Sequence, residues 1–243
     1  MGAEAGLRAR RGPLGPWPHA VAAGGANLVS MSRAPESNRP RLILASASPR
    51  RMDILTAAGL RFEVQPSHVE EDFDPRLPPE SAGPELAARK ARAIAGRHAG
   101  ADAFVIAADT LVALDPREPG GPWRYLGKPL DAEEARRFLG ALSGTRHRVL
   151  TGVAVQRCRD GALFVDHAQT WVHMRALTPA EIEAYVESRE WCGKAGGYAI
   201  QESADAFVTG LEGDFDTVVG LPLALTLRLL DTAGAGRWPG GTP

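Results

Sequence analysis

The ten residues 42–51 constrain the fold of this chain more than any other stretch. They read Leu-Ile-Leu-Ala-Ser-Ala-Ser-Pro-Arg-Arg. The apolar run 42–45 suits a buried strand. Ser48 and Pro49 suit the N-cap and the first position of a helix, and Gly59 suits the residue just past its end. The pattern therefore predicts a buried strand, a serine-containing turn and an amphipathic helix in direct succession.

Two arginines, Arg50 and Arg51, fall in the first turn of that helix. Cations there oppose the positive end of the helix dipole. The placement of the two arginines is explained if an anion lies at the turn. Free backbone N–H groups, the hydroxyls of Ser46 and Ser48, and the guanidinium groups would bind it. The segment predicts a phosphate cradle, and the alternative is a solvated basic helix start.

Length and charge restrict the class of protein. The chain has 243 residues, enough for one large domain or two lobes around a cleft. A formal net charge of −1 gives no overall field that would attract nucleic acid or a membrane surface. Cys158 and Cys192 lack disulfide or metal-ligand spacing, which suits a reducing compartment. We therefore expect a cytoplasmic protein with neither nucleic acid nor membrane as a partner; a homodimer remains open.

The two ends differ from the middle in composition. Residues 1–40 are rich in Gly, Ala, Pro and Arg and show no sustained periodicity. They are expected to be a disordered tail, or a start assigned too early with Met31 as the working start. A targeting peptide is a third alternative because the segment is Arg-rich and acid-poor. Residues 233–243 are expected to form a second tail, which leaves one folded domain over 41–232.

Strands and helices alternate between these tails, as in α/β proteins. The expected strands cover 42–45, 62–64, 103–108, 149–155 and 163–174, and the expected helices cover 49–58, 82–97, 131–142, a segment opening at 178, and 221–230. Residues 115–127 are expected to be a loop. A turn at Asp160-Gly161 joins two strands as a hairpin, so the sheet is expected to be mixed.

Carboxylates stand at two unusual places. Asp109 directly follows the apolar run 103–108, and a carboxylate at the end of a buried strand is suited to a metal or a water nucleophile. The alternative is an ordinary Asp that caps a turn. Glu70 and Glu71 begin an acidic cluster, for which the alternative is a solvated loop.

Lysines complete a set of residues suited to polyphosphate. Lys90 lies on the apolar stripe of the expected helix 82–97, from which it either extends to solvent or points into a cleft. Lys128 stands between a glycine and a proline. Lys194 and Gln201 bracket a segment whose glycines permit close approach by a ligand. These groups could hold a polyphosphate with a divalent cation and activate a water. The chain has no P-loop, GxGxxG, GxSxG or HExxH motif.

Five segments, taken in order, resemble the motifs of Maf-type nucleoside triphosphate pyrophosphatases, also called septum-formation inhibitors. They are Ser-Ala-Ser-Pro-Arg-Arg at 46–51, Ala-Asp-Thr at 108–110, Gly-Lys-Pro at 127–129, Lys-Ala-Gly-Gly-Tyr-Ala-Ile-Gln at 194–201 and Val-Val-Gly-Leu-Pro-Leu at 218–223. The resemblance spans about 41–231. It implies an elongated, two-lobed mixed α/β fold like that of inosine triphosphate pyrophosphatases, with the site between the lobes. It also implies hydrolysis of a nucleoside triphosphate to monophosphate and pyrophosphate with Mg²⁺ or Mn²⁺.

The resemblance also implies roles for single residues. Asp109 would accept the proton of the attacking water, and Glu71 would be its acidic partner, both near the metal; Glu70 is the alternative register. The residues expected to bind phosphates are Ser46, Ser48, Arg50, Arg51, Lys90, Lys128 and Lys194. Arg50, Thr110 and Gln201 match positions associated with base choice, in the pattern of the branch linked to dTTP and UTP.

The chain departs from the family pattern at two places. Glu202-Ser203 stands where a glycine commonly follows the glutamine, and Asp214-Phe215-Asp216 stands where Ser-Tyr is common. Both could alter substrate preference without removing the chemistry. The expected role is housecleaning of dTTP, UTP or modified pyrimidine nucleotides, with a link to cell-division arrest. A nucleotide-sensing regulator without turnover and a nucleotidyltransferase are the alternatives.

Overall fold

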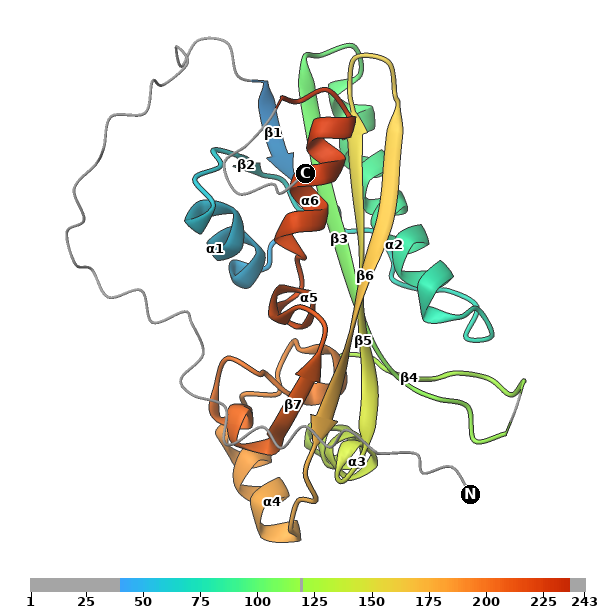
Figure 1. Cartoon of the computed structure of the whole chain (residues 1–243), viewed down its shortest axis with the longest axis vertical. Coiled ribbons are helices and arrows are strands. Elements are labelled where there is room, and N and C mark those ends of the chain that lie inside the picture. Colours follow the sequence, from blue (N-terminus) through green and yellow to red (C-terminus); the bar gives the residue numbers. More distant parts are fainter. Residues whose placement is uncertain (1–39, 119, 237–243) are drawn as a thin grey trace, which may run out of the picture.

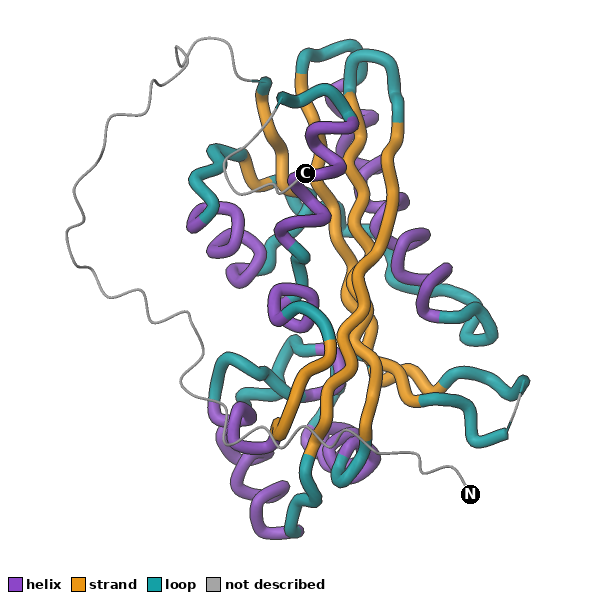
Figure 2. The backbone as a smooth tube through the Cα atoms, viewed as in Figure 1, coloured by secondary structure: helices purple, strands orange, loops and turns teal. Residues whose placement is uncertain are grey.

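A mixed β-sheet flanked by helices on both faces forms the frame of the molecule (Figures 1 and 2). The computed structural model describes residues 40–118 and 120–236. The expectations for residues 1–39 and 237–243 lie outside this part of the chain. Of the second expected tail, 233–243, the structure describes 233–236, where Ala233 and Ala235 are buried in an apolar cluster with α6 residues. Within it, no helix is both long and apolar enough to cross a membrane.

Seven strands of the described chain make the sheet, in the order β2-β1-β3-β5-β6-β7, with β4 paired to β3. They are β1 Arg41–Leu44, β2 Glu63–Val64, β3 Ala103–Leu114, β4 Arg124–Leu126, β5 Arg146–Arg157, β6 Leu163–Met174 and β7 Val208–Glu212. β1 runs parallel to β2 and β3, whereas all other pairs are antiparallel. The expected mixed α/β class is therefore confirmed.

The helices are short apart from α2. They are α1 Pro49–Ala57, α2 Pro79–Ala95, α3 Ala132–Leu142, α4 Pro179–Ser188, α5 Phe215–Val219 and α6 Leu223–Thr232, with 3₁₀ turns η2 Gly96–His98, η3 Ala195–Gly197 and η4 Ser203–Phe207. Capping residues mark the N-terminal ends of two of these helices. Asp131 accepts a hydrogen bond from the Glu134 N–H at 2.8 Å, and Thr178 and Glu181 form a capping box.

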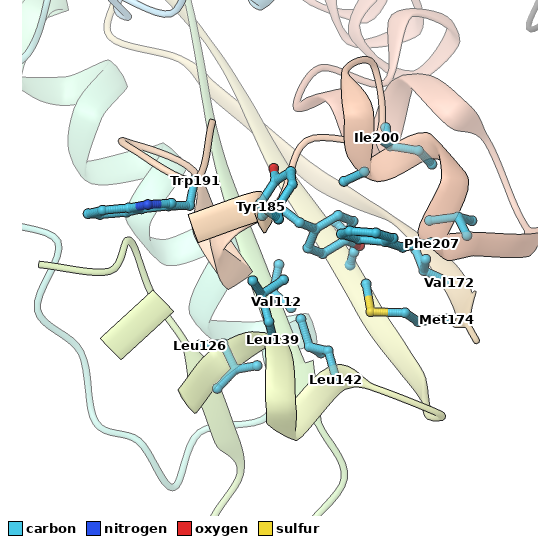
Figure 3. Close-up of a cluster of buried hydrophobic side chains, with 14 of the residues drawn as sticks. Val112, Leu126, Leu139, Leu142, Val172, Met174, Tyr185, Trp191, Ile200 and Phe207 are labelled. Atoms are coloured by element: carbon cyan, nitrogen blue, oxygen red, sulfur yellow. The ribbon is translucent and has the colours of Figure 1, made fainter. Parts of the chain in front are cut away.

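Three long strands connect two lobes. β3, β5 and β6 have 12 residues each, so each spans roughly 40 Å, and Figure 1 shows them running from the part that holds β1 and α6 toward the part that holds α3 and β7. The first lobe holds β1, α1, α2 and α6, and its apolar clusters lie on both faces of the sheet. The second lobe holds α3, α4 and β7 around another cluster (Figure 3). The expected elongated, two-lobed shape is confirmed.

The strand expected at 103–108 is longer than its apolar run, so Asp109 does not end a strand. β3 continues to Leu114, and the ladder to β5 continues through Asp109 paired with Gly152 and Thr110 paired with Thr151. Two polar residues in succession resemble a strand end in the sequence. Here cross-strand hydrogen bonds and the apolar residues 111–114 carry the strand past them.

The helix expected at 82–97 begins earlier, at Pro79, and its α-helical part ends at Ala95. Pro84 lies inside the helix, where it lacks one backbone donor. The helix packs closely against the sheet at this proline. A Cβ atom added to Gly152 of β5 would clash with the carbonyl group of Gly83 and with the Pro84 nitrogen. The helix thus lies directly on the sheet at this point.

Three short elements were not expected. β4 lies within the segment read as a loop over 115–127, and β7 and α5 precede α6. Each has three to five residues, too few for a periodic pattern to show. Pairing with β3 and β6 stabilises the two strands. α6 starts at Leu223 rather than at the expected Leu221.

Replacing Gly152 with alanine should destabilise the fold, because the new methyl group meets the backbone of α2. We expect the free energy of unfolding to fall by about 3 kcal/mol or more, as for an overpacked core. Gly140 is the matched control, since it is helical and exposed and an added Cβ meets no atom within 4 Å. Gly140→Ala should stabilise by up to ~1 kcal/mol. Urea denaturation measures both, and equal effects would contradict the close contact.

Candidate active site

A cavity of about 500 Å³ lies between the lobes. The β1–α1 turn and the first residues of α1 line it from the first lobe. Residues 192–195 and 198–201 line it from the second lobe, and β3 contributes Thr110 and Val112. All five motif segments contribute lining residues, although they are far apart in the sequence. A cavity therefore lies between the lobes, where the site is expected.

The cavity lies at an interruption in the pairing of β3. One edge of this strand pairs with β5 along nearly its whole length. The other edge pairs with β1 as far as Ile106 and with β4 only from Val112 onward. Asp109 and Thr110 lie in the gap. Since successive side chains of a strand point to opposite faces, Asp109 faces α2 and Thr110 faces α1, which explains two polar residues within a buried strand.

One ammonium group joins the two expected catalytic carboxylates. Lys90 Nζ donates hydrogen bonds to Glu71 Oε1 at 2.7 Å and to Asp109 Oδ1, and both Lys90 and Asp109 are buried. Lys128 Nζ donates to Glu71 Oε2 at 2.8 Å. No hydrogen bond of the described chain links Glu70 to this cluster. Two cations and two anions therefore offset one another here.

Glu71 is held in its ionised form. Partial burial alone would raise the pKa of its carboxyl group, but the hydrogen bonds from Lys128 and Lys90 outweigh burial and lower the pKa to about 2. Glu71 is thus a carboxylate at any pH near neutrality. It provides negative charge beside Asp109, as a site for a cation requires.

The position of the Lys90 ammonium group beside Asp109 depends on the contact between α2 and β5. Gly152 is the register partner of Asp109, and its missing side chain lets α2 approach the sheet at the same level. Lys90 follows two turns after Gly83 on that helix. A larger residue at position 152 would separate the ammonium group from the Asp109 carboxylate.

Arg51 connects three segments instead of facing the cavity freely. Its guanidinium group donates from Nε to the Gly220 carbonyl at 2.7 Å, from Nη1 to Ser46 Oγ at 3.1 Å and from Nη2 to Thr110 Oγ1 at 3.2 Å. Burial lowers its pKa. Ser46 Oγ also accepts from the Ser48 N–H at 3.2 Å. In this arrangement the Arg51 donors bind the protein itself.

Thr110 belongs to the same network. Thr151 Oγ1 donates to the Thr217 carbonyl at 2.7 Å, so in its 2.9 Å contact with Thr110 Oγ1 it is the acceptor. The Thr110 hydroxyl thus donates to Thr151 and accepts from Arg51. Sequence reasoning missed Thr151 and Thr217. The available signal for Thr151 was a threonine within the apolar run 149–155, and Thr217 contributes only its backbone carbonyl.

Arg50 differs from its neighbour. It lines the cavity, and no hydrogen bond within residues 40–118 and 120–236 engages its guanidinium group. Burial raises the pKa of Tyr185 in the second lobe, and the charge of Arg50 is one of the smaller effects that lower it. Of the two arginines, Arg50 is the one whose donors remain available to a ligand.

Lys194 and Gln201 lie on the wall formed by the second lobe. Lys194 Nζ donates to the Glu190 carbonyl and to Glu202 Oε2 at 2.6 Å. Ser203 binds Glu190 Oε2 through its N–H and hydroxyl groups. The unusual Glu202-Ser203 pair thus fixes this wall and partly neutralises Lys194. Gln201 is exposed to the cavity.

The carboxylates fit a magnesium or manganese ion that arrives with phosphate. Within the described residues, no group of three or more His, Cys, Asp or Glu side chains could hold a metal. Mg²⁺ commonly binds through one or two carboxylates together with substrate phosphates. Asp109 and Glu71 supply that number of carboxylates.

Comparison with known proteins identifies the family. Residues 41–233 match the family model described as Maf-like protein. The chain belongs to the Maf-like protein family. Its relatives include a dTTP/UTP pyrophosphatase of Moorella thermoacetica, 46% identical over 198 residues that cover 82% of this chain and 97% of the relative. A dTTP/UTP pyrophosphatase of Maricaulis maris is 48% identical over 202 residues, covering 82% and 91%.

A solved structure of a nucleoside-triphosphatase / dITP/XTP pyrophosphatase from Mycobacterium abscessus also matches. Its sequence is 17% identical, and the TM-score is 0.35. The match covers 61% of this Maf-family chain and 94% of the chain in the solved structure.

Methionine at positions 50 and 51 should have different effects. Arg51→Met leaves Thr110, Ser46 and the Gly220 carbonyl without their donor, so we expect the free energy of unfolding to fall by about 2 kcal/mol or more. Arg50→Met should change it by less than ~0.5 kcal/mol while weakening the binding of a non-hydrolysable triphosphate. Denaturation and calorimetry measure the two quantities. Equal loss of stability in both variants would refute the distinction.

Proposed function

We propose that the chain is a dTTP/UTP pyrophosphatase that hydrolyses a pyrimidine nucleoside triphosphate to the monophosphate and pyrophosphate. The observation that carries the proposal is the cluster of Asp109, Lys90, Glu71 and Lys128 beside the inter-lobe cavity, in a chain of the Maf-like family. The names of its relatives, which share nearly half of their residues with it, support the choice of substrate.

The triphosphate would bind through charge. It carries about four negative charges near neutral pH, so cations must offset its approach to Asp109 and Glu71. Arg50 and Lys128 face the cavity, and Ser48 stands at the start of α1, where the helix dipole favours anions. Arg51, Ser46 and Lys194 shape the surrounding walls, and their proposed phosphate contacts add to the bonds they already make.

Asp109 is the proposed base. One of its oxygens accepts a hydrogen bond from Lys90, which orients the carboxylate and leaves the second oxygen for a water. The water oxygen forms a bond to the α-phosphorus as its proton passes to Asp109. The bond from that phosphorus to the bridging oxygen breaks, and pyrophosphate leaves with the electron pair. Lys90 and Lys128 stabilise the developing charge.

A divalent cation would be held by Asp109 and Glu71 together with substrate oxygens. When bound, it supplies further positive charge against the phosphates. Glu71, with its low pKa, is ready for this role without losing a proton.

Base choice is proposed to depend on Gln201, Arg50 and Thr110. The Gln201 amide offers both donors and acceptors, which complement the N–H and carbonyl groups of uracil and thymine. A site built on such pairing rejects bases that leave it unpaired. Thr110 would act through the wall that it forms with Arg51, since its hydroxyl is already bonded there.

A panel of nucleotides tests the substrate. We expect dTTP and UTP to be cleaved with higher kcat/KM than ATP, GTP or 7-methyl-GTP, with release of pyrophosphate. Gln201→Ala should erode this preference more than it lowers the best rate. A clear purine preference in the wild-type enzyme would reject the proposal, and a uniform fall in turnover of the variant would indicate a structural role for Gln201.

Two variants test the chemistry. Asp109→Asn keeps the size but removes the charge and basicity, so kcat should fall at least ~10²-fold, the usual minimum for a lost general base. Lys128→Ala should mainly raise KM for the triphosphate. Circular dichroism confirms folding. If Asp109→Asn retains more than about a tenth of wild-type kcat at saturating metal, Asp109 is not the base, and Glu71 becomes the next residue to test.

A further inference from the structure

We propose that His147, Tyr198 and Tyr185 are positioning residues that hold the segment 194–201 in place and thereby set base selectivity. The inference rests on the proposed function, because Gln201 at the end of this segment is the proposed base reader. None of the three side chains needs to touch the base. They act through buried hydrogen bonds to the segment that carries Gln201.

The segment has little regular structure of its own. It contains only the three-residue turn η3, in which Gly196 and Gly197 have φ values of 74° and 70°. An added Cβ would lie 3.1 Å from Val112 at Gly196 and 3.0 Å from Pro129 at Gly197. Because an irregular segment lacks a repeating backbone ladder, its shape depends on bonds from its surroundings.

One of these bonds lies in the buried core. Tyr198 OH and His147 Nε2 share a hydrogen bond of 2.8 Å, and their rings meet edge to face with centroids 5.5 Å apart. His147 is fully buried on β5, and Tyr198 is 6% exposed. His147 Nδ1 has no partner within the described chain, so the Tyr198 hydroxyl is the one polar group that the imidazole meets. Loss of that hydroxyl would leave the ring unsatisfied.

The pair is uncharged near neutral pH. Burial lowers the pKa of His147 to about 3 and raises that of Tyr198. The bond therefore fixes the position of the segment and adds no net charge to the cavity. This suits a role in geometry rather than in binding phosphate.

Two further bonds fix neighbouring residues. The Tyr185 hydroxyl, presented by α4, accepts from the Ala199 N–H at 3.1 Å. The Gly196 N–H donates to the Gly127 carbonyl at 2.9 Å, beside Lys128. The segment is thus held at Gly196, Tyr198 and Ala199, and Gln201 follows two residues later. A displacement of about 1 Å at the anchors would misalign the Gln201 amide with a base edge.

The residues proposed to carry out the hydrolysis lie on other elements of the fold. Asp109 lies on β3 and Lys90 on α2, and neither bonds to the segment 194–201. Loss of an anchor should therefore reduce discrimination between bases while sparing the rate with the best substrate at saturation. A residue that merely stabilised the fold would instead lower the activity toward all nucleotides alike.

The experiment uses the three tyrosines of the chain, each changed to phenylalanine so that only a hydroxyl is removed. Tyr198→Phe and Tyr185→Phe lose bonds to the segment. Tyr125→Phe is the matched control, because the Tyr125 hydroxyl donates to the Leu77 carbonyl at 2.6 Å, outside the segment. The measurement is kcat and KM with dTTP, UTP, ATP and GTP for all three variants and the wild type.

We expect the ratio of kcat/KM for dTTP over ATP to fall about three- to tenfold in Tyr198→Phe and Tyr185→Phe, as for one lost hydrogen bond. The fall should come mainly from a higher KM for dTTP. Tyr125→Phe should keep the wild-type ratio. Unchanged ratios in both segment variants, or an equal fall in Tyr125→Phe, would overturn the inference.

Position 147 gives an independent check. His147→Gln keeps a polar group that can meet the Tyr198 hydroxyl, whereas His147→Leu does not, so we expect selectivity to be restored at least in part by Gln relative to Leu. Equal selectivity in the two folded variants would contradict a positioning role. A wild-type enzyme without base preference would overturn the proposed function as well, whereas a selective wild type with selective variants overturns the positioning role alone.

Discussion

Lys90 joins the two carboxylates of the site through one buried ammonium group. Buried charges are tolerated only when they are paired, so this contact decides which acidic residues can stand beside the cavity between the lobes. It also depends on the backbone contact between α2 and β5, because Gly152 lets the helix lie directly on the sheet. Catalytic geometry and close packing are thus a single constraint in this fold.

Where the pairing of β3 is interrupted, the side chains on its two faces contact different elements. Asp109 on one face binds Lys90 of α2, while Thr110 on the other face binds Arg51. Arg51 then ties together the β1–α1 turn, β3 and the turn before α6. Arg50 is left to face the cavity. Neighbouring polar residues therefore make different contacts. At the start of α1 and along β3, successive side chains point in different directions.

The second lobe supplies a wall whose shape depends on buried aromatic hydroxyls. Tyr185 (Figure 3) and Tyr198 both belong to the apolar cluster of this lobe. Each side chain is largely apolar and carries one polar atom, so it fills the core and still makes a directed hydrogen bond to the backbone or to a ring. Glu202 adds an ion pair to Lys194 on the same wall. The proposed base-reading residue Gln201 therefore lies on a wall of this lobe, whereas the proposed base Asp109 lies on the central strand β3.

The sequence by itself determined the family, the mixed α/β class, the start of α1 at Pro49 and the caps of α3 and α4. These follow from ordered motifs, periodicity and local capping, which need no distant partner. It also named Asp109, Glu71, Lys90 and Lys128 as candidates. Only the tertiary structure decided that Asp109 lies within a strand, that Pro84 lies inside a helix, and that Arg51 binds the protein while Arg50 faces the cavity. Those outcomes depend on the pairing of β3 with β5 and on the glycine contact at position 152, which join residues far apart in the chain and leave no local pattern.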